Sequence, residues 1–232
     1  MAMLNPVPQA TQNNRLGWRL AAGIGLGWVL SLNGHAAGET IAKAGVGTAP
    51  ACQTCHGASG GGIAQTGFPR LAGLGAAYME RQLAAFADGT RVSDVMMPVA
   101  KALTLVQRTE VSAYYAALPV PGVEPGMPAS LPAPATAASV VGAALATRGR
   151  WADKLPACEQ CHGPGGRGVG SDFPPLAGQG ATYLANQLTA WKKGERPPGP
   201  MALMSVIAKK LSADEVLAIA DHYAASPARD DR

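Results

Sequence analysis

The feature that most constrains this 232-residue chain is a five-residue box, C-x-x-C-H, that occurs once in each half. It reads CQTCH from residue 52 and CEQCH from residue 158, and together the two boxes use all four cysteines. C-x-x-C-H is the attachment signature of c-type haem, whose iron is then bound by the adjacent histidine. The boxes predict two covalently bound haem c groups, attached through Cys52, Cys55, Cys158 and Cys161, with His56 and His162 as proximal iron ligands.

A zinc site and a structural disulfide are the alternatives for these boxes. Cysteine and histidine are common zinc ligands, but a site built from both boxes would join ligand pairs about a hundred residues apart. It would also leave the occurrence of two boxes unexplained. A disulfide within each box would leave the adjacent histidine without a role. Haem attachment accounts for every residue of the motif.

Composition agrees with two cofactor-filled cores. Aromatic residues make up only 5% of the chain, whereas Gly (29) and Pro (19) are abundant, so large side chains are scarce for two ordinary cores. The formal charge is +4, and the 19 basic residues include Arg15 and Arg19, which precede the expected mature protein. Each haem would add two propionates, and no Lys/Arg-rich run is present. These features argue against a nucleic-acid partner.

The N-terminus has the pattern of an export signal. Arg15 and Arg19 are followed by a 13-residue apolar segment, Leu20–Leu32, and by a small-x-small site ending at Ala36. The apolar segment is shorter than the roughly 20 residues that a membrane-spanning helix needs. We expect residues 1–36 to be a signal peptide, with cleavage after Ala36 or Ala37 and a mature protein in the periplasm. An uncleaved membrane anchor is the alternative.

An internal repeat dominates the chain after residue 37. Four pairs of segments match in the same order, at offsets of 105 to 108 residues. The pairs are Cys52–His56 with Cys158–His162, Phe68–Gly73 with Phe173–Gly178, Tyr78–Leu83 with Tyr183–Leu188, and Met96–Pro119 with Met204–Pro227. This collinearity indicates a duplicated domain. We expect domain 1 at 37–118, a Pro/Ala-rich linker at 119–137, domain 2 at 138–227 and a short tail at 228–232.

Each copy has helical periodicity, and no segment alternates as a strand would. A short first helix is expected at 38–44 and again at about 138–148. The second helix of each copy carries large apolar residues at i, i+4 and i+7 on one face. These residues are Met79, Leu83 and Phe86 in the first copy and Leu184, Leu188 and Trp191 in the second. The sequence therefore predicts an all-α protein of two domains, each wrapped around one haem.

The last helix of each copy has clear start and stop signals. It opens with a capping box, Thr104-x-x-Gln107 or Ser212-x-x-Glu215. It ends before a proline, Pro119 or Pro227. Its inward-facing residues are expected to be Val111 and Tyr115 in the first copy and Ile219 and Tyr223 in the second.

A methionine is the candidate for the second ligand of each iron. The first copy offers Met96 and Met97, and the second offers Met201 and Met204. Only Met96 and Met204 align, each seven residues before the leucine that precedes the last helix, in segments expected to be loops. Thioether sulfur is a soft donor that favours reduced iron and raises the reduction potential. The alignment predicts Met96 and Met204 as the distal ligands.

Residues 38–226 resemble di-haem class I cytochromes c of the cytochrome c4 type. The shared patterns are C-x-x-C-H-G, F-P-x-L-A-G, Y-x-x-x-Q-L and M-x(6)-L-[ST], each present in both halves. The resemblance implies two class I cytochrome c domains related by a pseudo-two-fold axis, with the haem propionate edges near one another. It also implies that the carbonyls of Pro69 and Pro174 accept hydrogen bonds from the proximal histidines, which orients the imidazoles.

Two further features are assigned structural roles. The glycine runs 60–62 and 165–166 lack the lysine of a phosphate-binding loop, and we expect them to allow close approach of the backbone to the porphyrin edge. His222 aligns with Tyr114, and we therefore expect it to lie on a helix surface and not to bind iron.

The favoured function is that of a periplasmic electron carrier whose haems cycle between Fe(III) and Fe(II). Its partners would be redox proteins: a donor dehydrogenase or quinol-oxidising complex, and an acceptor terminal oxidase or reductase. An electron-transfer subunit of a larger dehydrogenase or oxidase, peripherally associated with the membrane, is the alternative. A haem enzyme, such as a peroxidase or sulfur-compound oxidase, would need an open iron site, and the paired methionines argue against one.

Overall fold

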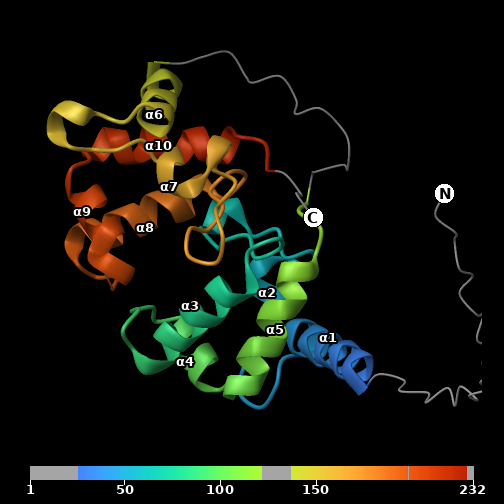
Figure 1. Cartoon of the computed structure of the whole chain (residues 1–232). Coiled ribbons are helices and arrows are strands. Elements are labelled where there is room, and N and C mark those ends of the chain that lie inside the picture. The colour runs from blue at the N-terminus through green and yellow to red at the C-terminus, as the bar shows by residue number, and fades with distance from the viewer. Residues whose placement is uncertain (1–25, 122–136, 198, 229–232) are drawn as a thin grey trace, which may run out of the picture.

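The structure is a computed structural model that describes residues 26–121, 137–197 and 199–228. These residues form helices joined by turns; within these ranges there are isolated β-bridges but no strand. Figure 1 shows two lobes, one built from each sequence repeat, packed against each other. The all-α prediction is therefore confirmed.

The two lobes have the same order of helices. Domain 1 contains α1 (Leu26–Ala44), α2 (Gln53–His56), α3 (Ala76–Asp88), α4 (Met96–Lys101) and α5 (Leu105–Ala117). Domain 2 repeats them as α6 (Ala137–Thr147), α7 (Glu159–His162), α8 (Ala181–Lys193), α9 (Leu203–Lys209) and α10 (Ala213–Ala225). Short 3-10 turns lie at Ala64–Thr66, Trp151–Asp153, Pro164–Gly166 and Pro200–Ala202.

The first and last helices of each domain cross in close contact, α1 on α5 and α6 on α10. The crossing point is a glycine in both domains. A Cβ added to Gly38 would stand 2.2 Å from the carbonyl oxygen of Glu110. A Cβ added to Gly142 would come equally close to the backbone of α10. His222, predicted to lie on a helix surface, is on α10 and is half-buried beside Gly142 at this crossing. The glycines let the helix backbones touch, which a side chain would prevent.

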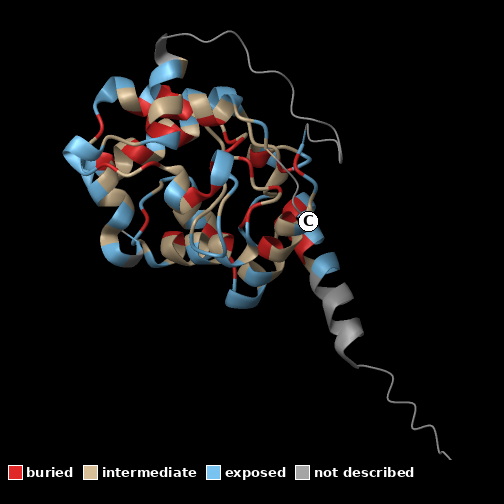
Figure 2. Ribbon diagram, turned by 45° about the horizontal axis from the view of Figure 1, so that its top comes forward, coloured by how far each residue is buried: buried red, intermediate tan, exposed pale blue. Residues whose placement is uncertain are grey.

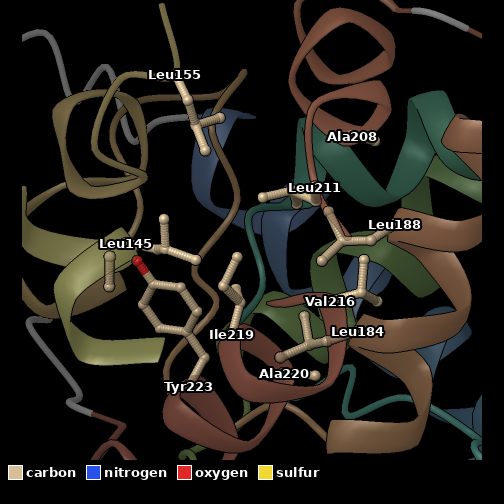
Figure 3. Packing of buried hydrophobic residues seen from close by; sticks show 11 residues of the cluster. Leu145, Leu155, Leu184, Leu188, Ala208, Leu211, Val216, Ile219, Ala220 and Tyr223 are labelled. Carbon is tan, nitrogen blue, oxygen red and sulfur yellow. The ribbon is translucent and has the colours of Figure 1, made fainter. Parts of the chain in front are cut away.

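Each domain buries one apolar cluster between these helices. Figure 3 shows the cluster of domain 2, in which Tyr223 of α10 lies against Leu145 and Ile219, with Leu184 and Leu188 of α8 on the far side. The cluster of domain 1 includes the equivalent Tyr115 and Val111.

The predicted inward-facing residues of the last helix are confirmed as buried: Val111, Tyr115, Ile219 and Tyr223. On the second helices, Met79, Phe86, Leu184 and Leu188 are buried, whereas Leu83 and Trp191 are half-buried. Figure 2 shows the exposed residues on the outer faces of the helices.

The predicted capping boxes are present in both domains. The Thr104 side chain accepts a hydrogen bond from the Gln107 N–H, and the Gln107 side chain accepts one from the Thr104 N–H. Ser212 and Glu215 make the same pair of bonds in domain 2. Each box satisfies two N–H groups that a helix start leaves without intrahelical partners.

The N-terminal helix differs from the prediction. Helix α1 begins at Leu26 and continues without a break through the expected cleavage site at Ala36 and Ala37. No described helix is long and apolar enough to cross a membrane. The basic residues Arg15 and Arg19, most of the predicted linker (122–136) and the last four residues lie outside the described residues.

Candidate haem sites

Each C-x-x-C-H box forms one short helical turn. In domain 1, Cys52 is the N-cap of α2, and His56 ends this helix. Residues three and four apart lie on the same helical face, so both thiols and the imidazole of a box face the same side. Cys158, Cys161 and His162 are arranged in the same way around α7. The four cysteines are half-buried and form no disulfide, so the disulfide alternative has no support.

The proximal histidines are buried and held by a carbonyl group. His56 Nδ1 lies 2.9 Å from the carbonyl oxygen of Pro69, and His162 Nδ1 lies 2.8 Å from that of Pro174. Burial lowers the pKa of both histidines, and the hydrogen bond to the proline carbonyl partly opposes this effect. A neutral imidazole that donates from Nδ1 presents the lone pair of Nε2 to a metal.

A phenylalanine further restricts each imidazole. Phe68 meets the His56 ring edge-on at a centroid distance of 6.1 Å, and Phe173 does the same to His162 at 6.1 Å. Each F-P dipeptide therefore fixes its histidine twice, through the ring of the phenylalanine and the carbonyl of the proline. The sequence motif contained both residues, but nothing in the spacing predicted the ring contact.

The environment of the cysteines favours the protonated thiol. Burial raises the pKa of Cys52, and it raises the pKa of Cys158 to about 11. A zinc site would need several deprotonated donors close together. Among the described residues, no group of three or more His, Cys, Asp and Glu side chains is arranged to hold a metal ion. The described residues therefore offer no set of ligands for the zinc alternative.

The structure separates the candidate methionines of domain 2. Met204 is half-buried and packs against the core cluster of that domain. Met201 has 80% of its surface exposed and a left-handed backbone, with φ of 57°, and so points away from any core. Met96 and Met97 of domain 1 are both half-buried, and the Met97 methyl group lies beside Gly89.

Met96 and Met204 occupy equivalent places, although not in loops as expected. Met96 is the first residue of α4, and Met204 is the second residue of α9. The Met96 N–H donates a hydrogen bond to the Ser93 side chain at 3.1 Å, so this N–H at the start of α4 has a partner. Short helices of six and seven residues were missed because one or two turns show no clear periodicity.

The glycines that follow the boxes face a tyrosine. Gly60 and Gly166 both have positive φ, and a Cβ on either would come within 3 Å of the ring of Tyr115 or Tyr223. These glycines let the loop lie on the buried tyrosine of the last helix. The expected approach of the glycine runs to a porphyrin edge stays a prediction.

The two domains meet through a crossed network of equivalent residues. Arg91 of domain 1 donates to the Tyr183 hydroxyl (3.1 Å) and the Gln187 side-chain oxygen (2.7 Å) of domain 2. The equivalent Arg196 of domain 2 donates to Tyr78 (3.2 Å) and Gln82 (3.1 Å) of domain 1. Each guanidinium also donates to the glutamine of its own domain, so each amide oxygen accepts from both arginines. We call Arg91 and Arg196 the guanidinium pair.

A second, asymmetric contact joins the F-P-x-L-A-G loops. The Gln179 side chain accepts from the Arg70 N–H at 2.8 Å and donates to the Arg70 carbonyl at 3.0 Å. The Arg70 guanidinium donates to the carbonyls of Ala72 and Ala177, which are equivalent positions in the two domains. Burial lowers the pKa of Arg70 to about 10, so the group remains charged at neutral pH. Neither junction contact was predicted from the sequence.

Comparison with known proteins identifies the family. The Cytochrome c family matches residues 36–114. Cytochrome c4 of Pseudomonas aeruginosa is 36% identical over 192 residues, which cover 81% of this chain and 89% of that protein. The chain is a di-haem cytochrome of the c4 type. A relative from Stutzerimonas stutzeri, named thiosulfate dehydrogenase electron acceptor, is 47% identical over 176 residues, which cover 76% of this chain and 79% of that protein.

A solved structure extends this comparison. The thiosulfate dehydrogenase TsdBA of Marichromatium purpuratum matches this c4-type cytochrome with a TM-score of 0.75 and 45% identity. The match covers 83% of this chain but only 40% of that longer chain. The relatives from Stutzerimonas stutzeri and Pseudomonas aeruginosa are named as an electron acceptor and a cytochrome c4. This cytochrome is accordingly an electron-transfer protein with two covalently bound haem c groups, and not an enzyme.

The residues present fit this cofactor. Each domain offers two thiols on one helical face and a buried imidazole whose Nδ1 is occupied by a proline carbonyl. Each also supplies an apolar cluster against which one of the box cysteines packs, Cys52 in domain 1 and Cys158 in domain 2. The same donor set occurs twice, which matches the two haems.

Proposed function

We propose that this cytochrome accepts electrons from a dehydrogenase that oxidises thiosulfate and delivers them to a further redox protein. The observation that carries the proposal is the 47% identity to a protein named for that role. The match to a domain pair within a longer thiosulfate dehydrogenase chain supports it. In that chain a similar pair is joined covalently to further sequence; here the pair would meet a separate dehydrogenase through a transient contact.

We infer that His56 and Met96 would bind the haem iron in domain 1, and that His162 and Met204 would bind it in domain 2. The histidines are supported by their burial and by their bonds to Pro69 and Pro174. Met204 is supported by its packing against the domain core, and Met96 by its equivalent place at the start of α4. When bound, each haem supplies a one-electron Fe(III)/Fe(II) couple.

The protein's own groups prepare this couple for transfer. The proline carbonyl fixes the ring plane of each histidine, so the ligand does not need to reorient when the charge of the iron changes. A methionine sulfur bound to the iron would favour its reduced form and raise its potential. Each domain also supplies a buried apolar cluster that packs against one box cysteine and would line part of the haem pocket.

We place this reaction in the periplasm, with residues 1–36 acting as a signal peptide that is removed. The support is the basic, apolar and small-residue pattern of the N-terminal segment. Haem attachment to C-x-x-C-H boxes agrees with an exported protein. N-terminal sequencing of the purified holoprotein tests this assignment, and a start at Met1 would refute it.

Rapid mixing tests the electron donor. The oxidised holoprotein is combined with catalytic amounts of a purified thiosulfate dehydrogenase, and the absorbance of reduced haem is followed after thiosulfate is added. We expect both haems to be reduced, with a rate proportional to the dehydrogenase concentration. Omission of thiosulfate or of the dehydrogenase is the control. Reduction no faster than the control, in a protein that a chemical reductant does reduce, would refute this donor.

A further inference from the structure

The two domains differ at the turn that leads into the haem box. Paired backbone hydrogen bonds close this turn, between Val46 and Ala49 in domain 1 and between Arg150 and Leu155 in domain 2. The tip between the paired residues is 47–48 in domain 1 but 151–154 in domain 2, so the tip of the second copy is longer. In domain 2 this longer tip forms the 3-10 turn Trp151–Asp153.

The longer tip presents a tryptophan to solvent. Trp151 has 63% of its surface exposed, and it is not a member of the apolar cluster that domain 2 buries. The corresponding tip of domain 1 consists of Gly47 and Thr48. Tryptophan is enriched in protein interfaces, where one ring can account for much of the binding free energy. The position of Trp151 therefore favours contact with another molecule over a role in folding.

Lysines lie around this tip, on three segments that contact one another. Lys210, just after α9, donates to the carbonyls of Asp153 (2.6 Å) and Lys154 (3.1 Å) in the tip. Lys192, near the end of α8, donates to the Leu211 carbonyl. Figure 1 shows α9 beside the end of α8 at the left edge of domain 2. We call five residues the lysine face: Lys154, Lys192, Lys193, Lys209 and Lys210.

The lysine face keeps an excess of positive charge. Arg150 pairs with both Asp153 and Glu215, so these two carboxylates are already engaged. Within the face, Lys193 is the one lysine that forms an ion pair with a described carboxylate, that of Glu195 at 4.0 Å. Both of these side chains are 61% exposed, and such pairs contribute little. The acidic residues nearest to the face in sequence are therefore fewer than its basic ones, even when Asp214 of α10 is included.

Domain 1 has no equivalent face. Helices α3 and α8 end at equivalent residues, as do α4 and α9, so the lysine positions can be compared directly. Of the five counterparts in domain 1, only Lys101 is basic: Thr48, Ala87, Asp88, Lys101 and Ala102. The two copies share their fold and their haem-binding residues, so neither requires the lysine face. An interaction outside the domain accounts for its presence in one copy.

We propose that the Trp151 tip and the lysine face dock a partner redox protein whose contact surface is acidic. The lysines would attract and orient such a partner, and the indole would supply an apolar contact at the centre. The surface is connected to one haem site, since the tip leads into Cys158 and Lys209 lies on the helix of Met204. A partner bound here would exchange electrons with domain 2. The inference rests on electron transfer by this cytochrome, and not on thiosulfate as the source of electrons.

Stopped-flow mixing of the reduced holoprotein with oxidised plastocyanin, an acidic copper protein, tests the role of charge. One electron passes from ferrous haem to Cu(II), which gives ferric haem and Cu(I). We expect Lys193→Glu/Lys209→Glu to lower the second-order rate constant at least about tenfold at an ionic strength of about 0.01 M. The decrease should nearly vanish at about 1 M, where screening limits charge interactions to about 3 Å. An unchanged rate constant at low salt would overturn the proposal.

Lys43→Glu/Lys101→Glu is the matched control. It changes the net charge by the same amount but in domain 1, and Lys101 is the counterpart of Lys209. We expect the rate constant to fall no more than about threefold, from the altered net charge alone. An equal fall in both double variants would show that net charge, and not the lysine face, governs the encounter, and would refute the proposal.

Trp151→Ala tests the apolar contact. We expect the rate constant to fall at least about fivefold at low and at high salt, because salt does not screen an apolar contact. Trp151 is exposed, so the haem absorption spectrum and both reduction potentials should stay unchanged and show that the variant is folded. Leu105→Ala, at a position of domain 1 that is 67% exposed, is the control and should have no effect. A rate constant unaffected by Trp151→Ala would exclude the tip from docking.

An anionic membrane surface is the alternative partner, because lysine and tryptophan also bind lipid headgroups. A protein is favoured, since the tip is a short turn, whereas binding to a membrane surface generally uses the apolar face of an amphipathic helix. In sedimentation with vesicles of phosphatidylglycerol and phosphatidylcholine, we expect the holoprotein to stay in solution. Sedimentation of the holoprotein but not of Trp151→Ala would assign the tip to the membrane and overturn the proposal. Thiosulfate dehydrogenase enters none of these measurements, so their failure is distinct from failure of the proposed function.

Discussion

Gly142 of α6 is in such close contact with α10 that a Cβ at this position would stand 2.1 Å from the carbonyl oxygen of Ala218. No rotation of a side chain can relieve this contact, because the obstructing atom belongs to the helix backbone. The two helices would have to separate, and the cluster around Leu145 and Tyr223 would open with them.

We expect Gly142→Ala to lower the free energy of unfolding by about 1–3 kcal/mol, the usual cost of forcing extra volume into a packed interior. Thermal unfolding of the holoprotein, followed by circular dichroism, measures the loss. Gly38→Ala should have a similar effect through domain 1. Gly75→Ala is the control, since no heavy atom lies within 4 Å of its Cβ position and its φ is −60°. An equal loss in the control would contradict this explanation.

Gln179→Leu should weaken the junction between the domains. Gln179 is 3% exposed, and its side chain satisfies both the N–H and the carbonyl of Arg70. Leucine would leave these buried groups unpaired, at about 1–3 kcal/mol for each group. We expect denaturant unfolding to change from one transition to two, because the domains lose part of their mutual stabilisation. The exposed Gln65→Leu should retain a single transition. An unchanged midpoint and shape for Gln179→Leu would refute this role.

Glu215 should make the stability of domain 2 dependent on pH. Burial opposes ionisation, but hydrogen bonds from the Ser212 N–H and from Arg150 outweigh it and hold the pKa of Glu215 below its ordinary value of 4.5. For a depressed carboxyl pKa, the stabilisation is complete above about 4.5 and is lost as the pH falls through the folded-state value.

Glu215→Gln should therefore cost about 1.5 kcal/mol at pH 7, the scale of a hydrogen bond to a charged group, and the difference from wild type should shrink below pH 4.5. Denaturant unfolding between pH 7 and pH 3 measures it. The neutral box of domain 1 supplies the comparison: the cost of Gln107→Ala should not change over this range. A cost of Glu215→Gln that stays constant with pH would rule out the ionised cap.

Replacement of a distal methionine should change one haem only. Met96→His puts a nitrogen donor in place of sulfur, and we expect the potential of one haem to fall and its methionine-to-iron absorption band to disappear. Met204→His should act on the other haem. Met97→Leu and Met201→Leu are the controls and should preserve both bands. If Met97→Leu lost a methionine-to-iron band, Met97 and not Met96 would be the methionine ligand of domain 1.

The elements predicted from sequence are those with local signals. Capping boxes are local, so Thr104 and Ser212 marked the starts of α5 and α10 correctly, and the prolines marked their ends. The periodicity of the last helix in each copy predicted the buried tyrosines, and the resemblance to cytochromes c4 implied the role of the proline carbonyls. These features depend on residues that are near in the chain or repeated at a fixed offset.

The junction was not predicted, because it depends on contacts between residues about a hundred positions apart. Arg91 and Arg196 do share the offset of the Y-x-x-x-Q-L motif, and Tyr78 and Gln82 belong to that motif. A signal was therefore present: a pair of aligned arginines in a chain with few charges. Periodicity alone assigns such residues to solvent-facing surfaces, and only the packing of the two copies buries them.

The crossed bonds of Arg91 and Arg196 also have the form of a symmetric homodimer contact, in which each partner offers the same donor and the same acceptor. An isolated domain would carry an arginine that retains only the glutamine acceptor of its own domain, and a tyrosine without its arginine donor. Two separate copies would associate only as far as their concentration allowed. Because one chain contains both copies, the second half is always within reach of the first. Duplication has thus converted a concentration-dependent association into a permanent feature of the chain.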